Sequence, residues 1–353
     1  MAARVVDWGL AALVAALAAT GGLTLFAGAS SDAWVFAAHD ALGLAICLLL
    51  AFKLRRVWPR LTPVGRWDRR TSASVGALAL VLTALASGVA WAAGVTPSPA
   101  GFSVLAWHEA LGAALVIAVA THMALRAKPL RSADIAQRRQ FLITAGIAAG
   151  SFAAWRVQRP LETVLRLTSA KRRFTGSYER DSFAGNAFPT TSWVADHPRQ
   201  IDPTSYRLRV EGLVARRLEL KLAELAGIDE LIATLDCTGG FYSTQHWRGI
   251  RLGRLLDEAG VAPHARHVSI ASRTGYRWSF ALSDARGLLL ATHVGGEALS
   301  HEHGAPLRLI VPDARGYQWV KWVERVEVRA DPDYGAPAST VWSSLTAAGT
   351  GRT

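Results

Sequence analysis

The chain has 353 residues, of which 51% are hydrophobic and 19% charged, and its formal net charge at pH 7 is +12. Residues 1–160 hold 15 Lys and Arg against 6 Asp and Glu, whereas residues 161–353 hold 24 against 21. The basic surplus therefore lies among long apolar runs, where it sets the orientation of membrane helices, and we expect no nucleic-acid partner. The two cysteines, Cys47 and Cys237, lie in different parts of the chain, which excludes a disulfide scaffold and a covalent c-type haem.

Four apolar stretches are long enough to cross a bilayer as helices of about 20 residues. They cover residues 8–28, 33–53, 74–94 and 102–125, and a shorter fifth stretch, 141–157, is richer in Gly and Ala. Lys and Arg are concentrated after the second and fourth stretches, while the loops at 29–32 and 95–101 have none. By the positive-inside rule we expect five spans in a bacterial cell membrane, a multi-pass protein with residues 161–353 on the extracytoplasmic side.

The fifth stretch begins with a distinct motif. Arg138-Arg139-Gln140-Phe141-Leu142 resembles the twin-arginine export signal and is followed by a mildly apolar region. The alternative is that Arg138 and Arg139 are simply two further cytoplasmic anchors. We favour export, because the twin-arginine route carries folded proteins that have already bound a cofactor, and we expect residues 131–160 to form a signal anchor.

The membrane part contains an internal repeat. His39-Asp40-Ala41-Leu42-Gly43 recurs 69 residues later as His108-Glu109-Ala110-Leu111-Gly112. The hairpin 8–53 therefore matches the hairpin 74–125 in the same sense, which indicates a pseudo-two-fold axis along the membrane normal. We expect residues 1–130 to form a four-helix transmembrane domain.

Ionisable residues inside membrane spans are costly, so they are functional by default. The repeat puts His39 and His108 at equal depth near the outer surface, and two facing imidazoles are the usual axial pair of a b-type haem. The alternative is a pair of interfacial histidines bonded to neighbouring helices. Because each histidine has a matched glycine one turn further in, Gly43 or Gly112, we expect the pair to ligate haem iron.

A third histidine of the membrane part, His122, follows His108 by 14 residues, about 21 Å along a helix. Its partner in the repeat is Lys53, which is a poor haem ligand at neutral pH. We therefore expect one haem b, and two only if His122 also binds iron. Otherwise His122 is an interfacial residue or part of a quinone site.

Residues 161–335 have the composition of a folded extracytoplasmic domain, and residues 336–353 that of a C-terminal tail. After an irregular entry, the sequence pattern predicts strands at 206–212, 230–236, 267–271, 306–311 and 319–329. Helices are predicted at 218–226 and at 252–260, the second ending at a glycine. The expected fold class is multi-domain: an all-α transmembrane bundle plus a mixed α+β domain.

Cys237 lies at the end of a predicted strand, before Thr238-Gly239-Gly240. A buried structural cysteine is common, but a thiolate where a strand ends suits metal binding or nucleophilic attack. A cysteine hydrolase would need a histidine base, and His246, His293, His301 and His303 are available. The residue types alone do not separate a metal ligand from a nucleophile.

Several segments together resemble the sulfite oxidase family of molybdopterin enzymes. They are Asp236-Cys237-Thr238-Gly239-Gly240, Trp247-Arg248-Gly249, the run from His303 to Pro312, and Gly316-Tyr317 through Lys321-Trp322-Val323. The resemblance covers residues 174–330. In layout the domain is similar to the catalytic subunits of periplasmic methionine sulfoxide reductases, here fused to a b-type cytochrome-like membrane domain. It implies molybdenum held by one molybdopterin and by one protein thiolate, Cys237, the catalytic residue.

The resemblance also assigns cofactor contacts residue by residue. These are Asn186, Pro189, Thr190, Ser272, His303, Arg308, Trp319, Val320 and Lys321. Arg308 and Lys321 suit a phosphate, whereas Trp319 and Val320 serve equally well as core residues. Ser272 and His303 depart from the residues of the family, and Arg248, Arg273 and Arg277 are candidates for binding an oxyanion.

These observations predict a molybdenum-dependent oxidoreductase of the membrane that exchanges electrons with quinone or quinol through the haem. Its substrate is an S-oxide, an N-oxide or a sulfite-like oxyanion. One alternative is a non-catalytic haem electron-transfer protein with a cofactor-free external domain, which would have no need of Cys237, Arg308 and Lys321. The other is a tethered cysteine hydrolase, which leaves His39 and His108 unexplained.

Overall fold

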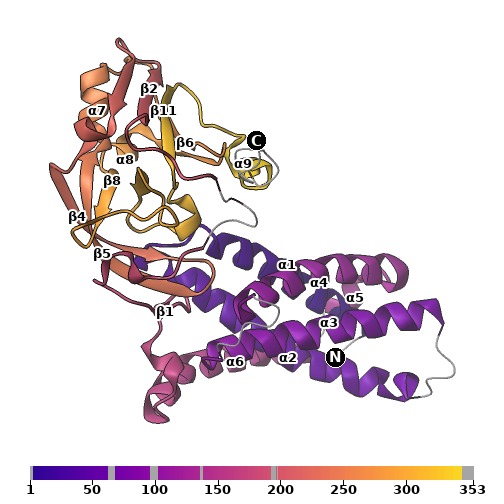
Figure 1. The fold of residues 1–353 in the computed structure, drawn as a ribbon. Helices are drawn as coiled ribbons and strands as arrows, with labels where there is room; N and C mark the ends of the chain where they lie inside the picture. The colour runs from indigo at the N-terminus through magenta and orange to yellow at the C-terminus, as the bar shows by residue number, and fades with distance from the viewer. Residues whose placement is uncertain are drawn as a thin grey trace. The chain divides into compact units, whose positions relative to one another are not determined.

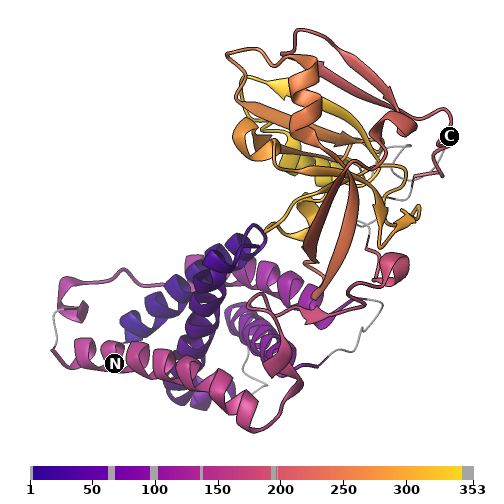
Figure 2. The ribbon, with the colours of Figure 1, turned by 90° about the vertical axis from the view of Figure 1, so that its left-hand side faces the viewer.

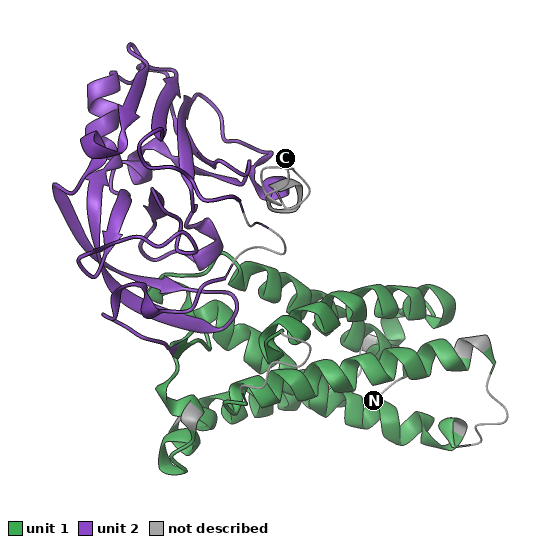
Figure 3. Ribbon diagram, viewed as in Figure 1, with its two compact units in different colours: residues 1–178 green, residues 179–353 purple. Residues whose placement is uncertain are grey.

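The computed structural model describes residues 3–62, 68–95, 102–135, 138–191, 196 and 198–343. The chain divides into two compact units, residues 1–178 and residues 179–353 (Figure 3). The two units are seen from two directions in Figures 1 and 2. Most of the loop 95–101 and the end of the predicted tail, residues 344–353, lie outside the described residues.

Four long helices of the first unit form two hairpins. They are α1 (Ala3–Thr24) against α2 (Ala33–Leu61), and α3 (Arg69–Ala92) against α4 (Val104–Arg126). Side-chain oxygens cap two of them, since Asp68 accepts from the Thr71 N–H and Ser103 from the Ala106 N–H. All four are long and apolar enough to cross a membrane, in agreement with the first four predicted stretches.

The two hairpins pack against each other, α1 on α4 and α2 on α3. Buried apolar side chains from all four helices meet between them, including Val14, Ile46, Val81 and Leu115. Large apolar side chains such as Trp34 and Ile117 are exposed, as expected for helices that face lipid. The arrangement fits the duplicated hairpin that the sequence predicts.

The predicted fifth stretch lies within α6 (Arg138–Val164), which packs against α2. Phe141, Phe152 and Val157 on α6 are exposed, whereas Ser151 is buried. α6 is not among the four described helices that meet the length and apolarity of a membrane span, so the fifth span stays a prediction. The short helices α5 (Ser132–Ile135) and η4 (Thr168–Lys171) precede and follow α6, and η1 (Ser30–Asp32) precedes α2.

The second unit is built on two sheets. The larger has the order β1-β5-β8-β10, with β4 paired to β5 and β9 to β8. These strands are β1 (Tyr178–Glu179), β4 (Asp229–Asp236), β5 (Phe241–Arg251), β8 (Leu289–Val294), β9 (Glu297–Ala298) and β10 (Arg308–Ile310). The smaller has the order β3-β2-β11-β6-β7 and includes one parallel pair, β2 with β11. Its strands are β2 (Arg207–Gly212), β3 (Leu218–Lys221), β6 (His267–Ser272), β7 (Arg277–Ala281) and β11 (Val323–Arg329).

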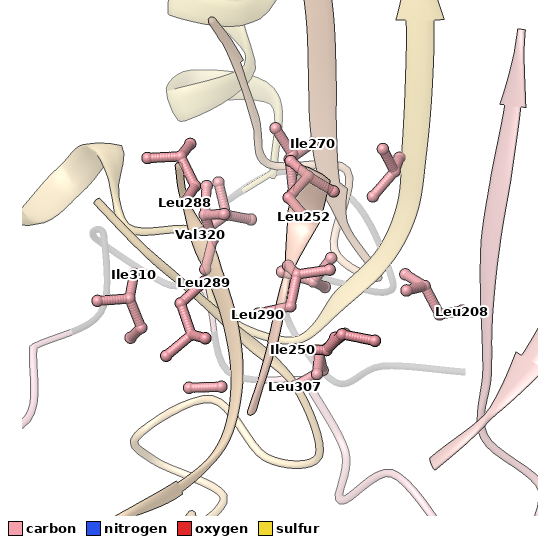
Figure 4. Packing of buried hydrophobic residues seen from close by; sticks show 14 of the residues in the cluster. Leu208, Ile250, Leu252, Ile270, Leu288, Leu289, Leu290, Leu307, Ile310 and Val320 are labelled. Atoms are coloured by element: carbon pink, nitrogen blue, oxygen red, sulfur yellow. The ribbon is translucent and has the colours of Figure 1, made fainter. Parts of the chain in front are cut away.

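Short helices connect these strands: η5 (Gly185–Ala187), η6 (Leu222–Leu225), α7 (Leu252–Ala259), α8 (Leu282–Ala285), η7 (Gly316–Gln318) and α9 (Ala336–Ser343). One core joins strands of both sheets and α7, with Leu208, Leu252, Ile270 and Leu290 buried in it (Figure 4). The mixed α+β prediction for this domain is therefore confirmed.

The predicted helix at 218–226 is wrong. Leu218–Lys221 is strand β3, paired with β2, and a single 3-10 turn follows it. The segment Leu-Glu-Leu-Lys alternates apolar and polar residues, and the open edge of β2 selects that period over the helical one. The predicted strand at 319–329 begins only at Val323, and the strand at 306–311 shortens to β10.

Candidate functional site

Cys237 occupies the tight turn between β4 and β5. Its N–H donates to Phe241 O at 2.8 Å, and the Gly240 N–H donates back to Cys237 O at 3.0 Å. The Gly239 N–H points at Cys237 Sγ at 3.3 Å, and the Thr191 hydroxyl lies 3.3 Å from the same sulfur. Hydrogen-bond donors directed at sulfur stabilise a thiolate, which is the form that binds metals.

Two cations lie beside this turn. Arg308 is 3% exposed, and its guanidinium carbon lies 5.7 Å and 5.8 Å from the ring centres of Trp247 and Trp319. Lys321 Nζ donates to Thr191 O at 2.8 Å and to Glu302 O at 2.6 Å, so Thr191 contacts both the lysine and Cys237. The cysteine and Lys321 are thus brought to one place, as the sequence predicts.

The electrostatics of these cations favour an anionic ligand. Burial lowers the pKa of Arg308 to about 10. Burial, and then the charge of Arg308, lower the pKa of Lys321 to about 7. Arg308 Nε is buried and lacks a hydrogen-bond partner in the described part of the chain. A bound phosphate would satisfy that donor and restore the charged form of the lysine.

Asn186 and His303 hold the loop that precedes Arg308. Asn186 donates to Ala298 O at 2.9 Å and accepts from the Ser300 N–H at 2.9 Å. His303 Nε2 donates to Phe188 O at 2.9 Å, so its Nδ1 accepts from the Ser300 hydroxyl at 2.8 Å. Burial lowers the pKa of His303 to about 4, which keeps the ring neutral. Both side chains are occupied by protein partners, and their contact with a cofactor stays a prediction.

The other predicted contacts divide between surface and core. Pro189 is half-buried and Thr190 exposed, in the segment between Phe188 and Thr191. Trp319 and Val320 are buried, and the backbone N–H of Trp319 donates to Gly316 O, so it is already satisfied. Ser272 is buried at the end of β6, where its Oγ accepts from Thr274.

Two of the three candidate oxyanion arginines, Arg273 and Arg277, line one cavity of about 260 Å³. Arg248 is on β5 of the larger sheet, while Arg273 and Arg277 lie at the turn and strand after β6 in the smaller one. Arg277 pairs with Asp333 at 2.6 Å. Arg273 lines an open cavity of about 490 Å³ together with Arg209 and Glu324. The structure thus brings Arg273 and Arg277 to one cavity and leaves Arg248 on the other sheet, and oxyanion binding by any of them stays a prediction.

An ion pair between Arg315 and Asp236 supports the cysteine turn, and the sequence pattern did not predict it. Asp236 immediately precedes Cys237, and its Oδ1 lies 2.6 Å from Arg315 Nη1. Both side chains are buried, at 1% and 4% exposure. Asp236 belongs to the cysteine motif, but only the parallel bridge between Asp236 and Arg315 brings the distant arginine to it.

In the membrane unit, His39 on α2 and His108 on α4 face each other. Their ring centres are 6.1 Å apart and the rings are nearly perpendicular, at 87°. Two imidazoles on opposite sides of one metal ion, each bonded at about 2 Å, would have centres about 6 Å apart. The pair therefore has the separation that an axial pair requires.

A second repeated feature orients these two rings. Thr20 Oγ1 lies 2.9 Å from His39 Nδ1, and Ser87 Oγ lies 3.2 Å from His108 Nδ1. His108 Nδ1 also reaches Ala84 O at 3.0 Å. Because Nδ1 is bonded in both rings, a metal would be bound through Nε2, the arrangement usual for histidine ligands. The sequence did not reveal Thr20 and Ser87, since they differ in type and their offset of 67 residues is two shorter than that between His39 and His108.

Part of the chain, mainly in the second unit, is similar in sequence to a known protein family. Residues 194–336 match the family described as oxidoreductase molybdopterin binding domain. The catalytic subunit of protein-methionine-sulfoxide reductase from Gluconobacter oxydans is 30% identical over 183 residues, 46% of this chain and 55% of the relative. Sulfite oxidase from Gallus gallus is 32% identical over 166 residues, 37% of this chain and 36% of the relative.

Two further proteins match a similar share of this chain. Nitrate reductase from Mycosarcoma maydis is 31% identical, covering 35% of this chain and 17% of the relative. The solved sulfane dehydrogenase of Paracoccus pantotrophus is 28% identical over 38% of this chain and 40% of its own, with a TM-score of 0.36. The chain thus spans about half or less of the length of each of these proteins.

Proposed function

We propose that this chain, whose residues 194–336 form a molybdopterin-binding domain homologous to methionine-sulfoxide reductase and sulfite oxidase, is a membrane-bound molybdenum-dependent oxidoreductase. It exchanges electrons between the quinone pool and an extracytoplasmic molybdenum site through a b-type haem. Its substrate is an S-oxide, an N-oxide or a sulfite-like oxyanion, and the names of the relatives point to the first and the last of these classes. The main support for the proposal is that a single chain contains both the Cys237 turn and the facing pair His39 and His108.

The residues of the external domain fit a molybdopterin. Cys237 would supply the thiolate ligand, and Arg308 and Lys321 would hold the anionic end of the pterin. The buried unpartnered Nε of Arg308 and the low pKa of Lys321 both favour an anion at this position. When bound, the cofactor supplies two-electron oxygen-atom transfer, for which the protein side chains have no equivalent. The chain itself would hold the sulfur of Cys237 in place, and Arg308 and Lys321 would neutralise the negative charge of the pterin.

The residues of the membrane unit fit a single b-type haem. His39 and His108 would be the axial ligands, and Thr20 and Ser87 would fix the orientation of their rings. When bound, the haem accepts and releases one electron at a time. A Cβ built at Gly43 or Gly112 meets no atom within 4 Å among the described residues, so neither glycine is in contact with a neighbouring helix.

The location follows from the basic loops and the twin-arginine motif. Arg138 and Arg139 are the first two residues of α6, the helix that contains the mildly apolar stretch 141–157. Changing both to Lys should leave residues 161–353 inaccessible to external protease while the four upstream helices still insert. Unchanged accessibility would remove the export assignment.

Substitution of the three membrane histidines tests the haem. His39→Ala and His108→Ala should each lose the low-spin b-type spectrum and stop quinol-dependent turnover, while turnover with an artificial dye as electron donor continues. His122→Ala should keep most of the spectrum, because its repeat partner is a lysine. Equal loss of haem in His122→Ala and His108→Ala would contradict the assignment.

A further inference from the structure

The bundle contains a second pair of repeat-equivalent residues in contact. Lys53 on α2 and His122 on α4 are 69 residues apart, as His39 and His108 are, and Lys53 Nζ lies 3.5 Å from His122 Nε2. Each member follows the corresponding histidine by 14 residues, about 21 Å along its helix. The two helices that carry the histidine pair therefore bring a polar pair together near their other end.

All four helices contribute to this polar cluster. Asp7 of α1 lies 3.2 Å from Lys53 Nζ and 3.0 Å from Arg56 Nη2. Ser74 of α3 lies 3.2 Å from His122 Nδ1. Asp7, Lys53 and Ser74 lie at the ends of the predicted spans 8–28, 33–53 and 74–94, so the cluster is at one surface of the expected membrane.

The contacts define what each group offers to a ligand. An ammonium has only donors, so Lys53 faces the lone pair of His122 Nε2, and the ring proton lies on Nδ1 toward Ser74. At 3.5 Å the contact between Lys53 and His122 is at the limit of a hydrogen bond. Lys53 thus offers a cationic donor and His122 a neutral acceptor side by side, and the hydrogen bond between them is weak.

We propose that Lys53 and His122 bind the headgroup of a membrane quinone, an inference that rests on the proposed function. The Lys53 ammonium donates to the quinone oxygen, and His122 Nε2 accepts the hydroxyl proton of the quinol. Oxidation of one quinol breaks two O–H bonds and releases two electrons and two protons. The electrons would pass singly to the haem iron proposed above. One proton would go to His122 Nε2 and the other to the Asp7 carboxylate, which lies 3.2 Å from Lys53 Nζ, because the ammonium has no lone pair to accept one. Reduction of a quinone runs the same exchange in reverse.

The test compares quinol-driven with chemical reduction of the haem in the purified full chain. Duroquinol is the probe, dithionite gives the total reducible haem, and the variants are Lys53→Met and His122→Gln. Arg55→Gln is the matched control, since Arg55 lies on the same helix and is exposed. We expect duroquinol to reduce the haem at least ~10-fold more slowly in both variants, with the dithionite spectrum unchanged and the control equal to wild type.

Three results would overturn the inference in different ways. Reduction of both variants by duroquinol at the wild-type rate removes the quinone from this pair while leaving the proposed function intact. Loss of part of the dithionite-reducible haem in His122→Gln makes His122 a haem ligand instead. A wild-type chain whose haem duroquinol cannot reduce contradicts the quinone link of the proposed function itself, and the inference falls with it.

Discussion

Asp236 and Arg315 form a buried ion pair that joins the cysteine turn to the loop leading to Lys321. Arg315 Nη1 lies 2.6 Å from Asp236 Oδ1, and Arg315 Nη2 approaches Cys237 O at 3.5 Å. The next residue, Gly316, packs on the turn so closely that a Cβ would lie 3.2 Å from Cys237 Cα. The pair therefore fixes the position of the proposed metal ligand relative to the proposed phosphate-binding segment.

Removal of one partner of this pair should be strongly destabilising, because it leaves a buried charge unpaired. We expect Arg315→Met to lower the free energy of unfolding by about 3–5 kcal/mol. Arg286 and Asp257 are also 2.6 Å apart but exposed, so Arg286→Met should cost about 0–1 kcal/mol. Denaturation of the purified chain followed by near-UV circular dichroism measures both, and equal losses would contradict the role assigned to Arg315.

Gly88 should be required for the haem because its backbone lies against a proposed ligand. A Cβ at Gly88 would come within 3.0 Å of His108 Cε1, whereas a Cβ at Gly76 of the same helix meets no atom within 4 Å among the described residues. We expect Gly88→Val to lose most of the low-spin haem absorbance and Gly76→Val to retain it. The reduced-minus-oxidised spectrum per chain decides, and retention of haem in Gly88→Val would contradict the predicted geometry.

Anion binding at Lys321 should weaken as the pH rises. Its folded-state pKa of about 7 lies below the unfolded value, so the contribution of this lysine to the stability of the cofactor-free fold increases from pH 7 upward. An anion binds the protonated form, so phosphate should raise the melting temperature more at about pH 6 than at about pH 8.

Lys321→Arg supplies the control for this pH dependence, because arginine stays charged throughout the range. In the variant the phosphate-induced increase in melting temperature should change with pH only through the titration of phosphate itself, and should therefore not fall at the higher pH. A wild-type response that is the same at the lower and the higher pH would remove Lys321 from the anion site.

The repeat made the membrane unit largely predictable. An offset of 69 residues identified His39 and His108, and the same offset relates Lys53 to His122. Thr20 and Ser87 were not predicted because the hydrogen bond needs only a hydroxyl group, so the residue type is free to differ between copies. The length of the apolar runs predicted the helices α1 to α4, since a helix that crosses lipid needs a long apolar run of a kind that soluble domains seldom contain.

In the external domain, the sequence predicted those strands and helices whose local pattern of apolar residues and glycines matches the final fold. Strand β4 ends at Asp236 as predicted, and α7 ends at Gly260, whose φ of 69° favours glycine. Strand β8 was not predicted because residues 289–291 are buried and apolar without alternation. The pairing of Arg315 with Asp236 depends on a contact across 79 residues, which no local pattern encodes.

The proposed haem and the proposed molybdenum site belong to one chain and should exchange electrons with each other. The direct measurement is the redox state of the haem after addition of substrate, in wild type and in Cys237→Ser. S-oxides and N-oxides are added to protein whose haem has been reduced by quinol, and sulfite-like compounds to protein whose haem is oxidised. A thiolate ligand has no equivalent in serine, so we predict that a substrate changes the haem spectrum of wild type and leaves that of Cys237→Ser unchanged. An equal response of the haem in both proteins, or a wild-type chain that contains haem and no molybdenum, would contradict this claim.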